Sequence, residues 1–217
     1  MFINIHTHQL SKLNSDTIDV YNQYPWDFIK NDAKYSIGIH PVFINKSNIN
    51  DDLEKIKLHI KKPDCIAIGE IGLDKLTDVN FDLQIKIFEE QLIIAEENQI
   101  PVIIHCVRSY QEILQIRKKM KLTIPFIFHG FNKNENLLKQ IISNKCIPSF
   151  GKNLLHNQNL QTIFANLSDD NYFLENDGSE IPIEDIYQKA AEIKNTSIEI
   201  ISENISNNFN RIFNHKN

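Results

Sequence analysis

The chain has 217 residues, of which 41% are hydrophobic and 24% are charged, and its formal net charge at pH 7 is −5. A chain of this length buries one sizeable core, so we expect one domain over residues 1–217. The acidic balance argues against a protein that coats nucleic acid. No apolar run approaches the roughly 18 residues of a membrane-spanning helix, so we expect no membrane partner.

The N-terminus lacks the basic and apolar regions of a signal peptide. The three cysteines, Cys65, Cys106 and Cys146, are far apart and form no C-x-x-C pair. Both features favour a reducing, cytoplasmic location.

Short β-rich apolar runs alternate along the chain with longer segments of helical periodicity. We expect strands over 2–6, 17–21, 35–40, 65–72, 101–106, 125–131, 146–151 and 172–177. Helical patterns occupy 81–98, 109–120, 134–144 and 159–167, and two closing helices are expected over 183–194 and 197–213. The candidate N-cap residues are Asp51 and Asp52, Ser109 and Asn134.

This alternation predicts an α/β fold, a (β/α)8 barrel of the TIM type with parallel strands inside and helices outside. A typical barrel has about 250 residues, so this one is short. Too few residues separate the first two strands for a crossover of about a dozen residues, and the next connection, 22–34, is also thin. We therefore expect a distorted barrel whose early helices are shortened or missing.

Titratable side chains stand at the ends of the expected strands. They are His6, His8, His40, Glu70, His105, His129 and Asp177. In a barrel these C-terminal strand ends meet on one face, where barrel enzymes carry their active sites. Ionised groups gathered there are costly to bury unless they are paired or bind a metal.

Each of these residues also has an ordinary structural interpretation. A histidine that ends a buried strand is often a hydrogen-bonded core residue. Asp177 could cap the following helix, and Glu70 could pair with an arginine. So many coincidences on one face explain the pattern poorly, so we favour a metal site.

The set of ligands favours two divalent ions. His6 and His8 occupy alternate positions of a strand and point the same way, so they hold one ion together with Asp177. His105 and His129 hold a second ion, and Glu70 bridges the two. Such ions clamp the attacking and leaving oxygens of a phosphoryl displacement and lower the pKa of a bound water, whose proton Asp177 accepts. Mixed nitrogen and oxygen ligands favour Zn²⁺ or Mn²⁺ over Mg²⁺.

Six motifs, in order along nearly the whole chain, resemble the TatD family of metal-dependent hydrolases. They are I-H-T-H-Q-L at 5–10, G-I-H-P at 38–41, G-E-I-G-L-D at 69–74, P-V-I-I-H-C at 101–106, F-H-G-F at 128–131 and L-E-N-D at 174–177. The G-E-I-G-L-D string is the most specific of them. The resemblance implies a distorted barrel with a binuclear site whose ligands are His6, His8, Glu70, His105, His129 and Asp177. It also implies a magnesium-dependent deoxyribonuclease that trims strands from the 3′ end, although some relatives are linked to deacylation.

The chain departs from the family pattern beside several of these ligands. Asn4 stands where the family usually has an aspartate, Val42 replaces a second histidine, and Val107 stands in place of an arginine. Asn176 replaces a threonine, and Gly178 begins the segment that replaces Ala-Pro. The ligands are kept whereas the substrate-facing residues vary, so the pattern leaves the substrate open.

His40 and Arg108 are the candidate contacts to the substrate, since a guanidinium beside metal ions suits a phosphate group. Both have alternatives. His40 could cap a turn, and Arg108 could pair with Glu112, four residues further along a helix.

The sequence favours a two-metal hydrolase of DNA ends or of a small phosphoester. An acidic chain can still grip one strand end in a metal-lined mouth, where Phe131, Phe150 and Trp26 are aromatic candidates for base stacking. A metal-dependent amidase or deacylase is the first alternative, although Glu70 occupies the strand on which a related class carries a carbamylated lysine. A non-catalytic metal-binding protein is the second, and the intact ligand set argues against it. The oligomeric state is not predicted.

Overall fold

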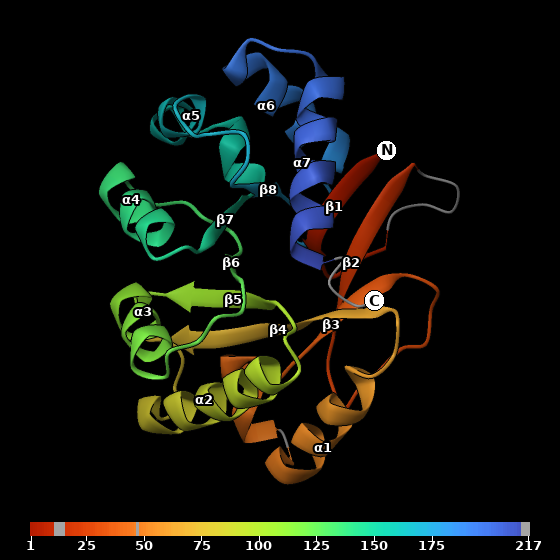
Figure 1. The fold of residues 1–217 in the computed structure, drawn as a ribbon, viewed down its shortest axis with the longest axis vertical. Coiled ribbons are helices and arrows are strands. Elements are labelled where there is room, and N and C mark those ends of the chain that lie inside the picture. The colour runs from red at the N-terminus through yellow and green to blue at the C-terminus, as the bar shows by residue number, and fades with distance from the viewer. Residues whose placement is uncertain (11–15, 47, 214–217) are drawn as a thin grey trace. The chain divides into compact units, whose positions relative to one another are not determined.

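The computed structural model describes residues 1–10, 16–46 and 48–213 (Figure 1). The protein has an α/β fold in which eight parallel strands follow one another in chain order. This is the strand order of a TIM-type barrel, so the predicted fold class is confirmed. The strands are β1 (Phe2–Thr7), β2 (Thr17–Gln23), β3 (Lys34–Ile37), β4 (Cys65–Asp74), β5 (Val102–Val107), β6 (Phe126–Phe128), β7 (Ile147–Phe150) and β8 (Phe173–Leu174).

Helices follow the later strands, as the periodicity predicts. The α-helices in the described residues are α1 (Ile49–His59), α2 (Phe81–Glu97), α3 (Tyr110–Lys119), α4 (Glu135–Ser143), α5 (Gln158–Ala165), α6 (Ile183–Lys194) and α7 (Ile198–Phe213). Two 3₁₀ helices, η1 (Pro41–Lys46) and η2 (Lys152–Leu155), follow the ends of β3 and β7. None of the helices within the described ranges combines the length and the apolar character that a membrane crossing needs.

The chain forms two compact units. Unit 1 comprises residues 1–21 and 129–217, and unit 2 comprises residues 22–128. Unit 1 contains β1, β7 and β8 with helices α4 to α7, and unit 2 contains β3 to β6 with helices α1 to α3. The expectation of a single domain over residues 1–217 stays a prediction.

In unit 2, β4 is buried along its whole length because strands lie on both sides of it and α2 packs along it (Figure 1). Two buried glutamines of α2 connect this helix to the ends of strands. Gln84 accepts from Asp74 N at 2.8 Å and donates to Asp74 O at 3.0 Å. Gln91 accepts from Ile39 N at 2.7 Å and donates to Ile39 O at 3.2 Å. These bonds satisfy buried backbone groups and fix the end of β4 and the segment just after β3.

In unit 1, β1 packs against α6, α7 and β8. The hydroxyl of Tyr187 on α6 donates to Ile3 O at 2.9 Å and accepts from Ile3 N at 3.0 Å. Burial raises the pKa of Tyr187, so its hydroxyl stays protonated and keeps the bond to Ile3 O. An α6 side chain therefore anchors the strand that carries the first two histidines.

Some predicted boundaries differ from the structure. The third strand ends at Ile37, so His40 lies three residues beyond it. Helix α1 begins at Ile49 after Asn48, so the prediction that Asp51 or Asp52 caps it is wrong; both lie in its first turn.

Ser109 occupies the N-cap of α3 but makes no side-chain cap bond, because its hydroxyl donates to Leu73 O at 2.6 Å instead. Asn134 caps α4 as predicted and accepts from Leu137 N.

The connection between β2 and β3 lacks a helix, as predicted from its length. No helix occurs over 24–33, between β2 and β3, and all of those residues are described. In the connection from β1 to β2, residues 11–15 lie outside the described residues. The expectation that this connection lacks a full helix therefore stays a prediction.

Candidate metal centres

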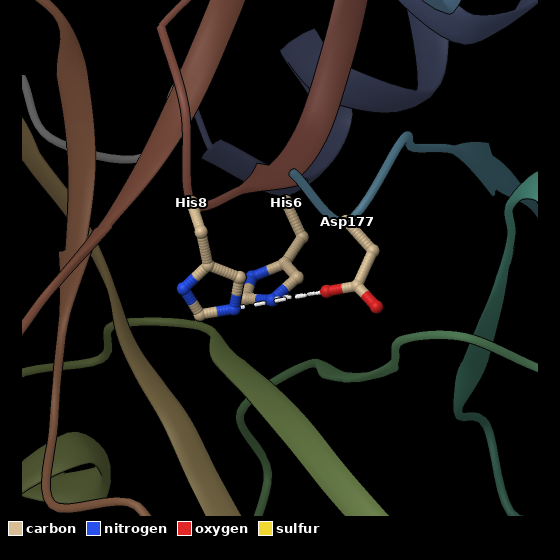
Figure 2. A group of neighbouring side chains, drawn as sticks. All are labelled: His6, His8 and Asp177. Carbon is tan, nitrogen blue, oxygen red and sulfur yellow. Dashed lines mark ion pairs between the residues drawn. The ribbon is translucent and has the colours of Figure 1, made fainter. Parts of the chain in front are cut away.

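Unit 1 brings together His6, His8 and Asp177, which we call cluster A (Figure 2). His6 lies within β1 and His8 follows it, so the two side chains point to the same side of the strand. Both Nε2 atoms face Oδ1 of Asp177, at 3.5 Å from His6 and 3.7 Å from His8. The His6 side chain is fully buried, whereas those of His8 and Asp177 are 36% and 38% exposed. The cluster therefore opens to solvent on the side of His8.

The spacing in cluster A suits a metal ion better than direct hydrogen bonds. Two ligand atoms that each lie about 2.1 Å from one tetrahedral ion are about 3.4 Å apart. The 3.5 Å and 3.7 Å separations are close to that value and exceed the usual range of a hydrogen bond. Two imidazoles and one carboxylate also form a donor set that suits Zn²⁺ or Mn²⁺. The residues therefore fit the ion that the sequence predicts here.

A buried amide network fixes the backbone that carries Asp177. Asn4 is fully buried, and its Nδ2 donates to Asp19 Oδ1 and to Asn176 Oδ1, both at 3.0 Å. Its Oδ1 accepts from Asn176 N at 3.0 Å. Asp177 has a left-handed backbone, with φ of 52°, and its N donates to His6 O at 3.2 Å. The turn after β8 is thus held against β1 by two hydrogen bonds to the Asn4 side chain and by one backbone bond. Asp177 does not cap α6, which begins at Ile183.

The two family departures in this network make one arrangement. Asn4 and Asn176, at which the resemblance implies a departure, pair with each other through two hydrogen bonds. Asp19 of β2 lies next to Asn4, so a carboxylate is present in the network although position 4 lacks one.

A third departure, Gly178, is required by its neighbour. Its φ is 65°, and a Cβ there would lie 2.9 Å from the Cβ of His8. Any larger residue would push against the backbone and side chain of this ligand.

His129 also lies in unit 1, with its ring centroid 4.5 Å from that of His6. Its Nδ1 lies 3.3 Å from Oε1 of Glu175, and Gly130 N donates to the same oxygen at 2.6 Å. Glu175 is fully buried, and its Oε2 has no hydrogen-bond partner within the described ranges. A buried carboxylate is costly unless a positive charge lies nearby, and a cation on His129 supplies one. This bond leaves Nε2 as the nitrogen that His129 presents to an ion.

Unit 2 brings together His40, Glu70 and His105, which we call cluster B. Oε1 of Glu70 lies 2.7 Å from His105 Nδ1 and 3.2 Å from His40 Nε2, and the two rings are 4.3 Å apart. All three side chains are mostly buried, with exposed fractions of 4% for Glu70, 10% for His40 and 17% for His105. Asn22 accepts from Glu70 N at 2.7 Å and fixes this point of β4. Two imidazoles and a carboxylate again form a suitable donor set, here already in contact.

His105 is held from its other side by Asp74. Its Nε2 lies 3.1 Å from Asp74 Oδ2, so a carboxylate contacts each of its ring nitrogens. Asp74 is the last residue of β4, and Gln84 fixes its backbone. A metal-bound histidine usually donates its second nitrogen to a carboxylate. With Asp74 in that role, His105 presents Nδ1 to an ion, the opposite choice to His129.

The predicted ligands are thus divided between the units. His105 and His129 belong to different units, so their shared ion stays a prediction, as does a bridge by Glu70 between two ions. His40 was predicted as a substrate contact and lies among the candidate ligands of cluster B. Its Nδ1 also accepts from Val42 N at 3.2 Å. His40 therefore caps a turn as well, which was the alternative to a substrate contact.

Arg108 follows β5 with an exposed side chain and a left-handed backbone, φ 54°. The alternative interpretation, that Arg108 pairs with Glu112, is wrong, because Glu112 pairs with Lys75. Arg108 makes no ion pair with any residue that the structure describes.

Sequence reasoning missed the carboxylates that hold the histidines, Glu175 and Asp74. Glu175 lies in the L-E-N-D motif and Asp74 in the G-E-I-G-L-D motif, and only their contacts with His129 and His105 show that they hold these histidines. Two of the three aromatic candidates for base stacking are wrong, because Phe131 and Phe150 are fully buried and pack on each other. Trp26 remains partly exposed.

Comparison with known proteins gives one family. The family model described as TatD related DNase matches residues 6–214. A protein from Haemophilus influenzae named as an uncharacterized metal-dependent hydrolase is 29% identical over 159 residues, which cover 69% of this chain and 60% of that protein. A 3′-5′ ssDNA/RNA exonuclease from Pectobacterium carotovorum is 29% identical over 128 residues, 57% of this chain and 45% of the relative. The chain thus spans about half of the curated relatives it matches.

Solved structures agree on the fold. A hydrolase TatD family protein from Entamoeba histolytica superposes with a TM-score of 0.77 at 17% identity, over 98% of both chains. A TatD homolog from Escherichia coli superposes with a TM-score of 0.74 at 22% identity, over 83% of this chain and 76% of the other.

Proposed function

The chain belongs to the TatD family of related DNases, and on that premise we propose that it is a metal-dependent hydrolase that cleaves phosphodiester bonds at the 3′ ends of DNA strands. The observation that carries the proposal is the geometry of cluster A. The distances from the His6 and His8 Nε2 atoms to Asp177 Oδ1, 3.5 Å and 3.7 Å, are close to those between two ligands of one ion. The named nuclease among the relatives supports the choice of substrate.

Six residues are the proposed ligands of two divalent ions, Zn²⁺, Mn²⁺ or Mg²⁺. They are His6, His8, Asp177 and His129 in unit 1 and Glu70 and His105 in unit 2. When bound, such ions lower the pKa of a water and neutralise charge on the phosphate. The protein's part is to hold each donor atom in place, through Glu175 on His129 and Asp74 on His105.

Asp177 and Glu70 are the proposed catalytic residues. The Asp177 carboxylate faces both imidazoles of cluster A and is more than a third exposed, so a water can reach it. We assign to it the proton of the attacking water. Glu70 is buried and fixed by three contacts, which suits a ligand that must not move during turnover.

Arg108 and His40 are the proposed substrate contacts. Arg108 extends into solvent just beyond His105, where its guanidinium can take a phosphate oxygen with two N–H groups. His40 offers a second donor to the substrate only if it does not bind an ion in cluster B, and metal analysis of His40→Ala separates those roles.

Digestion of 5′-labelled single-stranded DNA tests the proposal, with Mg²⁺, Mn²⁺ or Zn²⁺ supplied separately and Asp177→Asn measured alongside. We expect a ladder that shortens from the 3′ end and is lost in the variant. The same oligonucleotide made of RNA shows whether the 2′-hydroxyl is tolerated. Intact DNA with every metal, in protein shown to carry ions, would overturn the assignment of the substrate.

A further inference from the structure

Unit 2 carries a group of three aromatic side chains beside cluster B, which we call the aromatic platform: Tyr24, Trp26 and Phe43. Tyr24 and Trp26 stack with ring centroids 5.1 Å apart and planes inclined by only 12°. Phe43 stands edge-on to both, at 5.4 Å from Tyr24 and 6.2 Å from Trp26. All three are partly exposed, unlike the fully buried phenylalanines of unit 1. A stacked pair left partly open to solvent offers a flat apolar surface to a ligand.

The platform connects to cluster B through ring contacts. Phe43 lies 5.6 Å from the ring of His40, and His40 in turn contacts Glu70 at 3.2 Å. Tyr24 directly follows β2, and Phe43 lies in η1, which follows β3. The rings therefore stand at the same C-terminal strand ends as the candidate ligands of cluster B, and a bound substrate lies at these strand ends in this class of fold.

The connection that carries the platform is short for a barrel. Residues 24–33 contain no helix, so the chain after β2 turns back at once and places two aromatic residues within three positions. Pro25 between them is buried and fixes its own φ, which limits the freedom of the turn. The stack is thus a fixed surface that costs little conformational entropy to organise when a ligand arrives.

We propose that the aromatic platform is a base-binding subsite, on which the nucleobase next to the cleaved phosphodiester stacks. This rests on the proposed function and specifies its substrate as a nucleotide rather than a simple phosphoester. Every base has an aromatic face, so the subsite accepts any base and gives no sequence preference. The chain, whose net charge is −5, then gains affinity for a strand end from stacking.

Trp26 is the only tryptophan of the chain, so its fluorescence reports on the platform directly. Deoxyadenosine 5′-monophosphate is the probe, and deoxyribose 5-phosphate, which has no base, is its control. We expect saturable quenching by the nucleotide and none by the sugar phosphate. Quenching that is equal for the two, or absent at millimolar nucleotide in folded protein, would overturn the proposal.

Variants separate stacking from folding. We expect Trp26→Leu to weaken nucleotide binding, measured by equilibrium dialysis, about 5- to 150-fold, the range of one lost stacking contact. Trp26→Phe restores a ring and should recover most of the affinity. Phe28→Leu is the matched control, because Phe28 is a partly exposed aromatic of the same unit that packs on Tyr35 and His59 instead. Equal losses in Trp26→Leu and Phe28→Leu would mean a structural role only.

An oligonucleotide with an abasic 3′-terminal residue distinguishes this proposal from the proposed function. If the protein is a nuclease with a base subsite, the abasic end raises KM in the parent protein and has little effect in Trp26→Leu. Cleavage of both ends with the same KM would retain the nuclease and reject the subsite. Nucleotide binding at Trp26 without any cleavage would retain the subsite and reject the proposed reaction.

Discussion

Clusters A and B use the same donors, two imidazoles and one carboxylate, yet they are built differently. In cluster A the imidazole nitrogens stand 3.5 Å and 3.7 Å from the carboxylate oxygen, and the side chains of His8 and Asp177 are 36% and 38% exposed. In cluster B the corresponding distances are 3.2 Å and 2.7 Å, and the carboxylate of Glu70 is 4% exposed. The distances in cluster A are those of ligands around a shared ion, whereas the donor atoms of cluster B lie at hydrogen-bond distance from one another.

This difference in distance and exposure predicts different metal-binding properties for the two clusters. In cluster A both Nε2 atoms lie beyond the usual hydrogen-bond distance from Asp177 Oδ1, so an ion between these atoms displaces no short contact to that oxygen. An ion that enters cluster B must replace the bond between Glu70 and His105, which costs part of the binding free energy. Cluster A should therefore bind metal more tightly, and it is also the cluster whose carboxylate a water can reach.

The largest expected effect is on turnover, from Asp177→Asn. Asparagine tolerates the left-handed backbone of this position, so the fold and most metal binding should survive. Loss of the proton acceptor should lower kcat about 100- to 10,000-fold, measured on labelled DNA. Asp185→Asn, at an exposed position in the first turn of α6, is the control. Unchanged kcat would remove Asp177 from the mechanism.

Metal titration of two further variants tests the order of affinity directly. We expect the parent protein to bind two Zn²⁺ ions with separable affinities, as isothermal titration calorimetry would show. His8→Ala should remove the tighter event and His105→Ala the weaker one, each leaving about one ion. The comparison between the clusters fails if His105→Ala removes the tighter event.

The carboxylates behind the histidines should have intermediate effects on metal affinity. Glu175→Gln weakens the hold on His129, and Asp74→Asn weakens the hold on His105. Each should lower metal affinity about 10- to 100-fold without a change in the helical content by circular dichroism. Affinity equal to that of the parent protein would show that the histidines are positioned by packing alone.

The smallest effect should come from the amide network beneath cluster A. Asn4→Ala leaves Asp19 and Asn176 short of a buried partner, which should lower the free energy of unfolding by about 1–3 kcal/mol in urea denaturation. Asn4→Asp places a second carboxylate beside Asp19 and should cost at least as much. A variant that is more stable than the parent protein would show that the hydrogen bonds between Asn4 and Asn176 do not stabilise the fold.

The sequence predicted that His6, His8 and Asp177 group together, as they do in cluster A, but not how each side chain is held. His6 and His8 could be placed on one side of a strand because side chains alternate with a fixed period. The histidines and carboxylates at strand ends were recognised because burying an ionised group is costly unless the group is paired or binds a metal. Glu175 and Asp74 carried no such signal, since a carboxylate inside a motif does not show which nitrogen it contacts.

Periodicity and chain length by themselves determined the α/β class, the order of the eight strands and the lack of a helix over residues 24–33, because these depend on local pattern and on how far a chain can reach. The tertiary structure alone decided that Glu112 pairs with Lys75 rather than Arg108, that Phe131 and Phe150 are core residues, and that one cluster is open while the other is closed. Those outcomes depend on contacts between residues far apart in the chain. Distances of a few tenths of an ångström, which no spacing in a sequence encodes, separate a hydrogen bond from the place of an ion.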